Sequence, residues 1–86
     1  MITTKANIQQ LLRTHARNGV PLEMSVPFLL KLAGWGVEET ANAAGFTRTH
    51  FYLALRGKRT PPDQLRALVV ERLGVDPWSI NRSIAK

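Results

Sequence analysis

Apolar residues recur at spacings of three and four along most of the chain, which is the period of amphipathic helices. The first such segment begins after Thr4, a good capping residue, and ends at Asn18 and Gly19, a typical helix stop. Its recurring apolar positions are Ile8, Leu11, Leu12 and Ala16. No stretch shows the strict alternation of a half-buried strand. The pattern therefore predicts an all-α protein.

A second helix is expected after a cap at Ser25, because Pro27 would then lie in the first turn, where its missing N–H is tolerated. Gly34 ends this segment, and residues 20–24 form the connector before it. Its inward positions are predicted to be Phe28, Leu29, Leu32 and Ala33.

Two short helices follow, joined through Gly45, Phe46 and Thr47, which is the sequence pattern of a helix-turn-helix. Glycine permits the backbone reversal, and Phe46 fills the angle between the helices. Ala41 is small enough for the second helix to cross closely above it. Thr47 is expected to cap that second helix, which ends at Gly57.

The next long helix is predicted to start at Thr60-Pro61-Pro62-Asp63, with Thr60 as the cap and proline at the first helical position. Gly74 closes it, and Asp76 with Pro77 begins a short last helix. The sequence thus predicts five or six helices. Their expected core consists of Leu29, Leu32, Trp35, Ala41, Phe46, Phe51, Leu65, Leu68 and Leu73.

The segment 35–61 resembles the lambda-repressor-like helix-turn-helix family, which includes Cro, phage repressors and Xre-type regulators. The residues that carry the resemblance are Glu38, Glu39, Ala41, Gly45, Phe46, Thr47, Arg48, Thr49, Phe51 and Ala54, with the basic exit loop 56–61. Thr40 stands where an aliphatic residue is usual, Gly36 where a Ser or Thr cap is usual, and Leu53 and Leu55 where polar residues are frequent.

The resemblance implies a compact five- to six-helix DNA-binding domain with an extra N-terminal helix. The whole chain, 1–86, is then one domain. Residues 1–24 supply the N-terminal helix and connector, 25–80 the lambda-repressor-like core, and 81–86 a tail.

Charge supports a polyanionic partner. Twelve Lys and Arg against six Asp and Glu give a formal net charge of +6, which favours nucleic acid or an anionic surface. No acidic residue occurs between Glu39 and Asp63, although that stretch contains Arg48, Arg56, Lys58 and Arg59. The charge by itself is equally consistent with a basic surface that is simply solvated. The inference of DNA binding therefore depends on the helix-turn-helix pattern.

On a helix, Phe51 and Ala54 face inward while the residues expected to read DNA bases face outward or lie at the edge. These are Arg48, Thr49, Tyr52 and Leu53. Arg48 can pair with guanine O6 and N7, and Leu53 can touch a thymine methyl. The residues expected to bind phosphate are Thr47, Arg56, Lys58, Arg59 and Thr60. Tyr52 and Leu53 also fit an ordinary surface or a protein contact, and His50 points away from this face.

The resemblance implies a transcriptional regulator, in the first instance a repressor, that binds double-stranded operator DNA with an inverted repeat as a homodimer. Candidate dimer contacts are Trp78, Ile80 and Ile84, which fit packing onto the same monomer equally well. The alternative is a protein-interaction module, an adaptor or anti-activator, on the same scaffold. This alternative is motivated by Leu53, Leu55 and the extra N-terminal helix. RNA binding ranks third, because the sequence shows no platform of aromatic side chains on which bases could stack.

Other classes of function find little support. The chain has no cysteine, and it lacks a nucleophile–base pattern, a phosphate-cradling glycine loop and metal-ligand spacing. We therefore expect no enzyme activity, cofactor, metal or small-molecule ligand. No apolar run approaches the roughly 20 residues that span a bilayer. The basic N-terminal segment resembles a mitochondrial presequence, but it ends as an ordinary helix does, so we do not read it as a targeting signal. We expect a cytoplasmic, nucleoid-associated protein of bacterial or phage type.

Overall fold

In the computed structural model, which describes residues 4–79, the predicted all-α fold is confirmed. The helices are α1 (Lys5–Arg17), α2 (Leu22–Leu32), α3 (Val37–Ala43), α4 (Arg48–Leu55) and α5 (Asp63–Leu73). A sixth helical segment begins at Pro77, and the described residues contain no strand. None of the helices in this part of the chain is long and apolar enough to cross a membrane.

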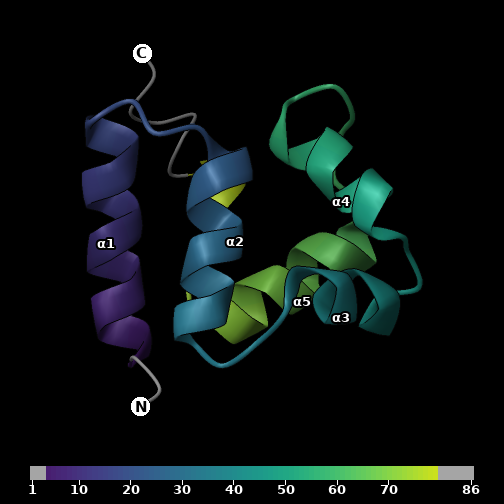
Figure 1. Cartoon of the computed structure of the whole chain (residues 1–86), viewed down its shortest axis with the longest axis horizontal. Helices are drawn as coiled ribbons and strands as arrows, with labels where there is room; N and C mark the ends of the chain where they lie inside the picture. The colour runs from purple at the N-terminus through teal and green to yellow at the C-terminus, as the bar shows by residue number, and fades with distance from the viewer. Residues whose placement is uncertain (1–3, 80–86) are drawn as a thin grey trace.

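The central element is α2, which contacts each of the other four helices. Its neighbour α1 lies along one side of it, and α4 lies on the other side (Figure 1). The first helix begins at the predicted cap, where the Thr4 hydroxyl accepts a hydrogen bond from the Asn7 backbone N–H at 3.3 Å. Because α5 contacts α1, α2 and α3, it closes one end of the bundle.

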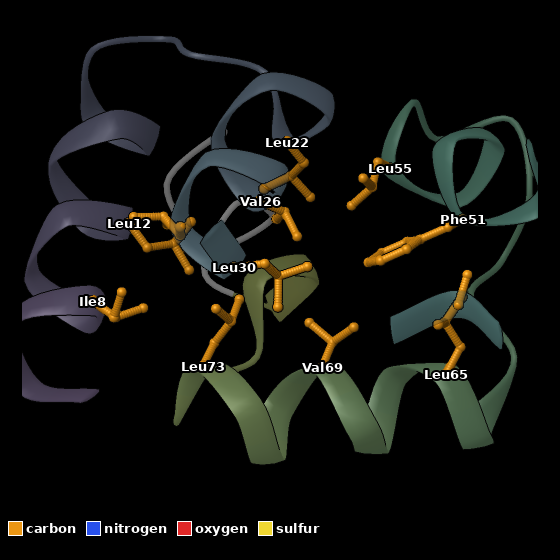
Figure 2. Packing of buried hydrophobic residues seen from close by; sticks show 12 residues of the cluster. Ile8, Leu12, Leu22, Val26, Leu30, Phe51, Leu55, Leu65, Val69 and Leu73 are labelled. Atoms are coloured by element: carbon orange, nitrogen blue, oxygen red, sulfur yellow. The ribbon is translucent and has the colours of Figure 1, made fainter. Parts of the chain in front are cut away.

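A single apolar core joins all five helices. Figure 2 shows Phe51 pointing from α4 toward α2 and α5, where it meets Val26, Leu30, Leu65 and Val69 around the centre. Of the predicted core residues, the fully buried ones are Leu29, Ala41, Phe51, Leu65 and Leu73. Those that are only partly buried are Leu32, Phe46 and Leu68.

The predicted start of the second helix is wrong. This helix begins at Leu22, after Pro21, so Pro27 lies in its interior rather than in its first turn. Leu22 and Val26 extend the apolar stripe toward the N-terminus, and both are buried. Ser25 is not a cap but a buried helical residue whose hydroxyl lies 2.7 Å from Nδ1 of His15 on α1.

Two predicted core aromatics lie at the surface instead. Phe28 is 51% exposed, because the stripe that runs through Leu22, Val26 and Leu30 turns it outward. Trp35 is 37% exposed, and the Arg72 guanidinium lies 4.0 Å from its ring centre. This cation–π contact covers one face of the indole ring.

Arg72 also explains the threonine that replaces the usual aliphatic residue in α3. The Thr40 side chain is fully buried, and its hydroxyl donates to the Gly36 carbonyl at 2.7 Å and accepts from Arg72 Nη1 at 2.8 Å. A buried hydroxyl with both partners avoids the cost of an unpaired polar group. Gly36 has no capping side chain, and the Glu39 carboxylate instead accepts from its backbone N–H at 3.4 Å.

The start of α5 differs from the predicted one. Asp63 is the first helical residue, and Pro62 stands at the N-cap position in an extended conformation. A residue before proline is disfavoured in the helical region, so Pro61 cannot begin a helix that contains Pro62. Thr60 therefore does not cap α5 and lies exposed in the loop.

The C-terminal part of the described chain packs back onto the bundle. Asp76 caps the last segment through the backbone N–H of Trp78 at 3.1 Å, and its other oxygen accepts from Arg66 Nε at 2.8 Å. That hydrogen bond raises the pKa of the Arg66 guanidinium. The Trp78 indole donates to the Ala54 carbonyl at 3.1 Å. Trp78 thus contacts its own monomer, while Ile80 and Ile84 lie outside the described residues.

Truncation of Phe51 should strongly destabilise the folded state. Phe51→Ala removes a fully buried ring and is expected to lower the free energy of unfolding by roughly 3–5 kcal/mol. Urea denaturation followed by circular dichroism measures this change. Phe28→Ala is the matched control, because the same atoms are lost from a ring that is 51% exposed, and its effect should be about 1 kcal/mol. Equal effects of the two changes would contradict the burial of Phe51 in the core.

Candidate nucleic-acid interface

The turn between α3 and α4 forms as the sequence predicts. Gly45 has φ +87°, a left-handed conformation that favours glycine. The Phe46 backbone N–H then donates to the Ala41 carbonyl at 2.8 Å, and the Phe46 ring packs against the core. The Thr47 hydroxyl caps α4 by accepting from the His50 backbone N–H at 3.2 Å. These contacts fix where α4 begins and therefore which residues share its outer face.

An open hollow of about 600 Å³ lies over α3 and α4. All four predicted base-reading residues line it, as do two of the predicted phosphate-binding residues. The lining residues from the α4 side are Thr47, Arg48, Thr49, Tyr52, Leu53 and Arg56. We call this surface the α4 face. The other predicted phosphate contacts, Lys58, Arg59 and Thr60, are exposed in the loop directly after α4.

Two further residues line the hollow over α4 and were not predicted from the sequence. Glu38 and Asn42, one helical turn apart on α3, line the same hollow. Glu38 was named only among the residues that carry the family resemblance, and Asn42 was not singled out. Their spacing of four residues places both exposed side chains on one flank of α3, and this spacing is the signal that marks them.

Tyr52 lies between Arg48 at the start of α4 and Arg56 at its C-cap. The guanidinium carbon of Arg48 is 5.5 Å from the centre of its ring, and that of Arg56 is 5.9 Å away. The three residues are spaced by four, so they form one row along the helix. The ring is half-buried and packs against the core. Tyr52 therefore connects the two cations to the rigid part of the molecule.

Arg56 has a second partner on α2. Its Nε donates to the Glu23 carboxylate at 2.6 Å. Both side chains are partly exposed, so the pair contributes little to stability, about 0–1 kcal/mol. The ion pair instead fixes the position of the Arg56 guanidinium, which contacts both the Tyr52 ring and the Glu23 carboxylate.

His50 and Leu55 face away from the hollow. The His50 ring packs edge-on against Phe46, with 6.0 Å between ring centres, as expected for a helix-packing residue. Leu55 is buried in the core, so it offers no surface to a partner protein. Of the three features that motivated a protein-interaction module, only Leu53, which is half-buried, and the N-terminal helix remain.

Among the described residues, no group of three or more His, Asp or Glu side chains is placed to hold a metal ion. Comparisons of the chain with models of protein families, with curated proteins and with solved structures find no match. The family resemblance therefore rests on the residues quoted above and remains a prediction.

The cap of α4 can be tested with two threonines of the same turn. Thr47→Ala removes the hydroxyl that accepts from the His50 N–H and should lower the free energy of unfolding by about 1 kcal/mol. Thr49→Ala removes an exposed helical side chain and should leave stability within about 0.5 kcal/mol. Thermal unfolding of both variants measures the difference. A larger loss for Thr49→Ala than for Thr47→Ala would mean that α4 begins elsewhere.

Proposed function

We propose that the protein is a sequence-specific DNA-binding transcriptional regulator, with repression as its simplest mode of action. The observation that carries the proposal is the α4 face, where Arg48, Thr49, Tyr52 and Leu53 line one open hollow on a short, capped helix. In this proposal α4 enters the major groove, which is wide enough to admit one helix.

The chemistry of the α4 face fits the edges of base pairs. Arg48 and Thr49 are exposed at the N-terminal end of α4, where a recognition helix makes its base contacts. Arg48 offers a planar donor pair to guanine, and Leu53 offers an apolar contact to a thymine methyl. Glu38 adds an acceptor that fits the N4 amino group of cytosine. One surface thus presents donors, an acceptor and an apolar group.

The loop after α4 supplies the cations that a phosphate backbone requires. Lys58 and Arg59 are exposed and follow α4 directly, and they form no ion pair with the described part of the chain. Contacts to phosphate fix the register of a protein on DNA and provide most of its non-specific affinity. The position of this loop beside α4 supports such a role (Figure 1).

We further propose that two copies bind an operator with an inverted repeat, because one reading helix covers only a few base pairs. Repression would then follow from occupancy of DNA that a polymerase needs. Trp78, a candidate dimer contact, already donates to its own Ala54 carbonyl, so any dimer contact from this residue involves the remaining surface of the ring.

A protein-interaction module is the second candidate, and exposed apolar side chains on α2 favour it. Met24 is 65% exposed and Phe28 is 51% exposed, one helical turn apart. Exposed apolar groups of this size are common at protein contacts. Neutralising Lys58 and Arg59 separates the candidates, because binding to a protein at α2 would survive that change and DNA binding would weaken.

Base-reading and phosphate-binding residues should respond differently to truncation. Arg48→Ala is expected to cost about 1–3 kcal/mol on the operator and to relax the base preference at one position. Lys58→Ala and Arg59→Ala should weaken operator and random DNA alike, and each should lower the log–log salt slope by about 0.9.

The measurement begins with selection of bound sequences from random duplex DNA at a stated salt concentration. Each variant is then titrated on the selected duplex and on a scrambled one at several salt concentrations. Binding without sequence preference or salt dependence would refute the proposed function. If Arg48→Ala weakened both duplexes equally while Lys58→Ala changed the base preference, the orientation of α4 on DNA would be wrong.

Removing the carboxylate partner of Arg56 should strengthen DNA binding. Glu23→Gln frees the guanidinium that the carboxylate now holds at 2.6 Å, and one further phosphate contact should steepen the log–log salt slope by about 0.9. Glu71→Gln is the charge-matched control, since Glu71 is exposed on α5, away from the α4 face. Equal effects of both changes would mean that only net charge matters. Weaker binding by Glu23→Gln would show that the carboxylate positions Arg56 for DNA.

A further inference from the structure

The outer face of α1 is a second basic surface. Ile8 and Leu12 are buried toward α2 and α5, so residues on the opposite side of the helix face outward. An open hollow of about 420 Å³ lies over this side. It is lined by Ala6, Gln9, Gln10, Arg13, Thr14 and Arg17. We call this surface the α1 face.

The two arginines of the α1 face have no acidic partner in the described part of the chain. Arg13 and Arg17 are both exposed and one helical turn apart, and neither forms an ion pair there. In the sequence, no Asp or Glu precedes Glu23. By contrast, Arg56 and Arg66 each contact a carboxylate, and Arg72 contacts Trp35. The α1 face therefore carries positive charge that is not neutralised nearby.

The composition of the α1 face favours a phosphate backbone over a protein surface. Its apolar content is limited to Ala6 and the side-chain stems, whereas the centres of protein interfaces are enriched in aromatic and other large anchors. Arg, Gln and Thr are side chains that commonly bind phosphate oxygens. Arg13, Arg17, Gln10 and Thr14 are exposed for such contacts, whereas the Gln9 amide donates to the Gly74 carbonyl at 2.7 Å. Positive charge alone would also fit an acidic protein as the partner. The bridging experiment distinguishes an acidic protein from DNA.

A duplex on the α4 face leaves the α1 face free. The two helices lie on opposite sides of α2 (Figure 1), and the molecule extends 33 Å along its longest axis. Because Ile8 and Leu12 turn toward α2, the α1 face is directed away from it. One straight duplex seated in the hollow over α4 therefore does not pass along α1.

We propose that the α1 face binds the phosphate backbone of a second DNA segment, so that one molecule bridges two segments. This inference rests on the proposed DNA binding by the α4 face. Two arginines provide a weak, sequence-independent contact whose strength falls with salt. Such a contact becomes effective once the first segment is bound, because the local concentration of neighbouring DNA is then high.

A bridging assay tests the proposal. The selected operator duplex is immobilised and saturated with protein, and recruitment of a labelled random-sequence duplex from solution is measured at about 0.1 M salt. Arg13→Gln with Arg17→Gln should reduce recruitment by roughly tenfold or more, since two phosphate contacts are lost. The affinity of the same variant for the immobilised operator should change less than about twofold, and its melting temperature should match that of the unmodified protein.

Lys31→Glu is the control, because it changes the net charge by the same two units at an exposed position on α2 outside both faces. It should leave recruitment unchanged. Failure of the unmodified protein to bind any duplex would overturn the proposed function itself. Normal operator binding without recruitment, or equal recruitment by the arginine variant, would overturn the α1 proposal alone. An equal loss of recruitment with Lys31→Glu would mean that only the net charge of the protein matters. Binding of an acidic polypeptide, but not of duplex DNA, to the α1 face would mean that this face binds a protein.

Discussion

Burial of Phe51 is the interaction on which the orientation of α4 depends. α4 spans only Arg48–Leu55, and isolated helices of this length are not stable in water. Its position is therefore set by Phe51, Ala54 and Leu55, which are buried against the rest of the bundle (Figure 2). Once these three face inward, the helical period turns Thr49, Tyr52 and Leu53 toward the hollow. The composition of the α4 face thus follows from the core.

The helical period accounts for what the sequence could predict. Caps at Thr4 and Thr47 and the stop after Arg17 are local signals, and each lies where it was expected. All four predicted base-reading residues share one face because a correctly placed helix start fixes the angle of every later residue. The prediction failed at α2, where Ser25 has the preference of a cap but lies inside the helix.

The features that the sequence did not reveal depend on contacts between distant residues. Ser25 is accommodated by His15 on another helix, and Trp35 is held at the surface by Arg72, far along the chain. The Glu23–Arg56 pair, which affects a predicted phosphate-binding residue, likewise joins α2 to the end of α4. No periodicity or local motif encodes such pairs, because they arise only when the helices pack.

The placement of acidic residues explains why the cationic surfaces remain available. Glu23, Glu38, Glu39 and Asp63 lie in the first turns of helices, and Asp76 caps the last helical segment. At these positions a negative charge interacts favourably with the helix dipole, so five of the six acidic residues serve the termini of helices. Two of them also pair with arginines. Of the remaining cations, Arg13 and Arg17 lie on the α1 face, and Arg48, Lys58 and Arg59 lie on or beside α4. At these surfaces an external polyanion would supply the missing negative charge.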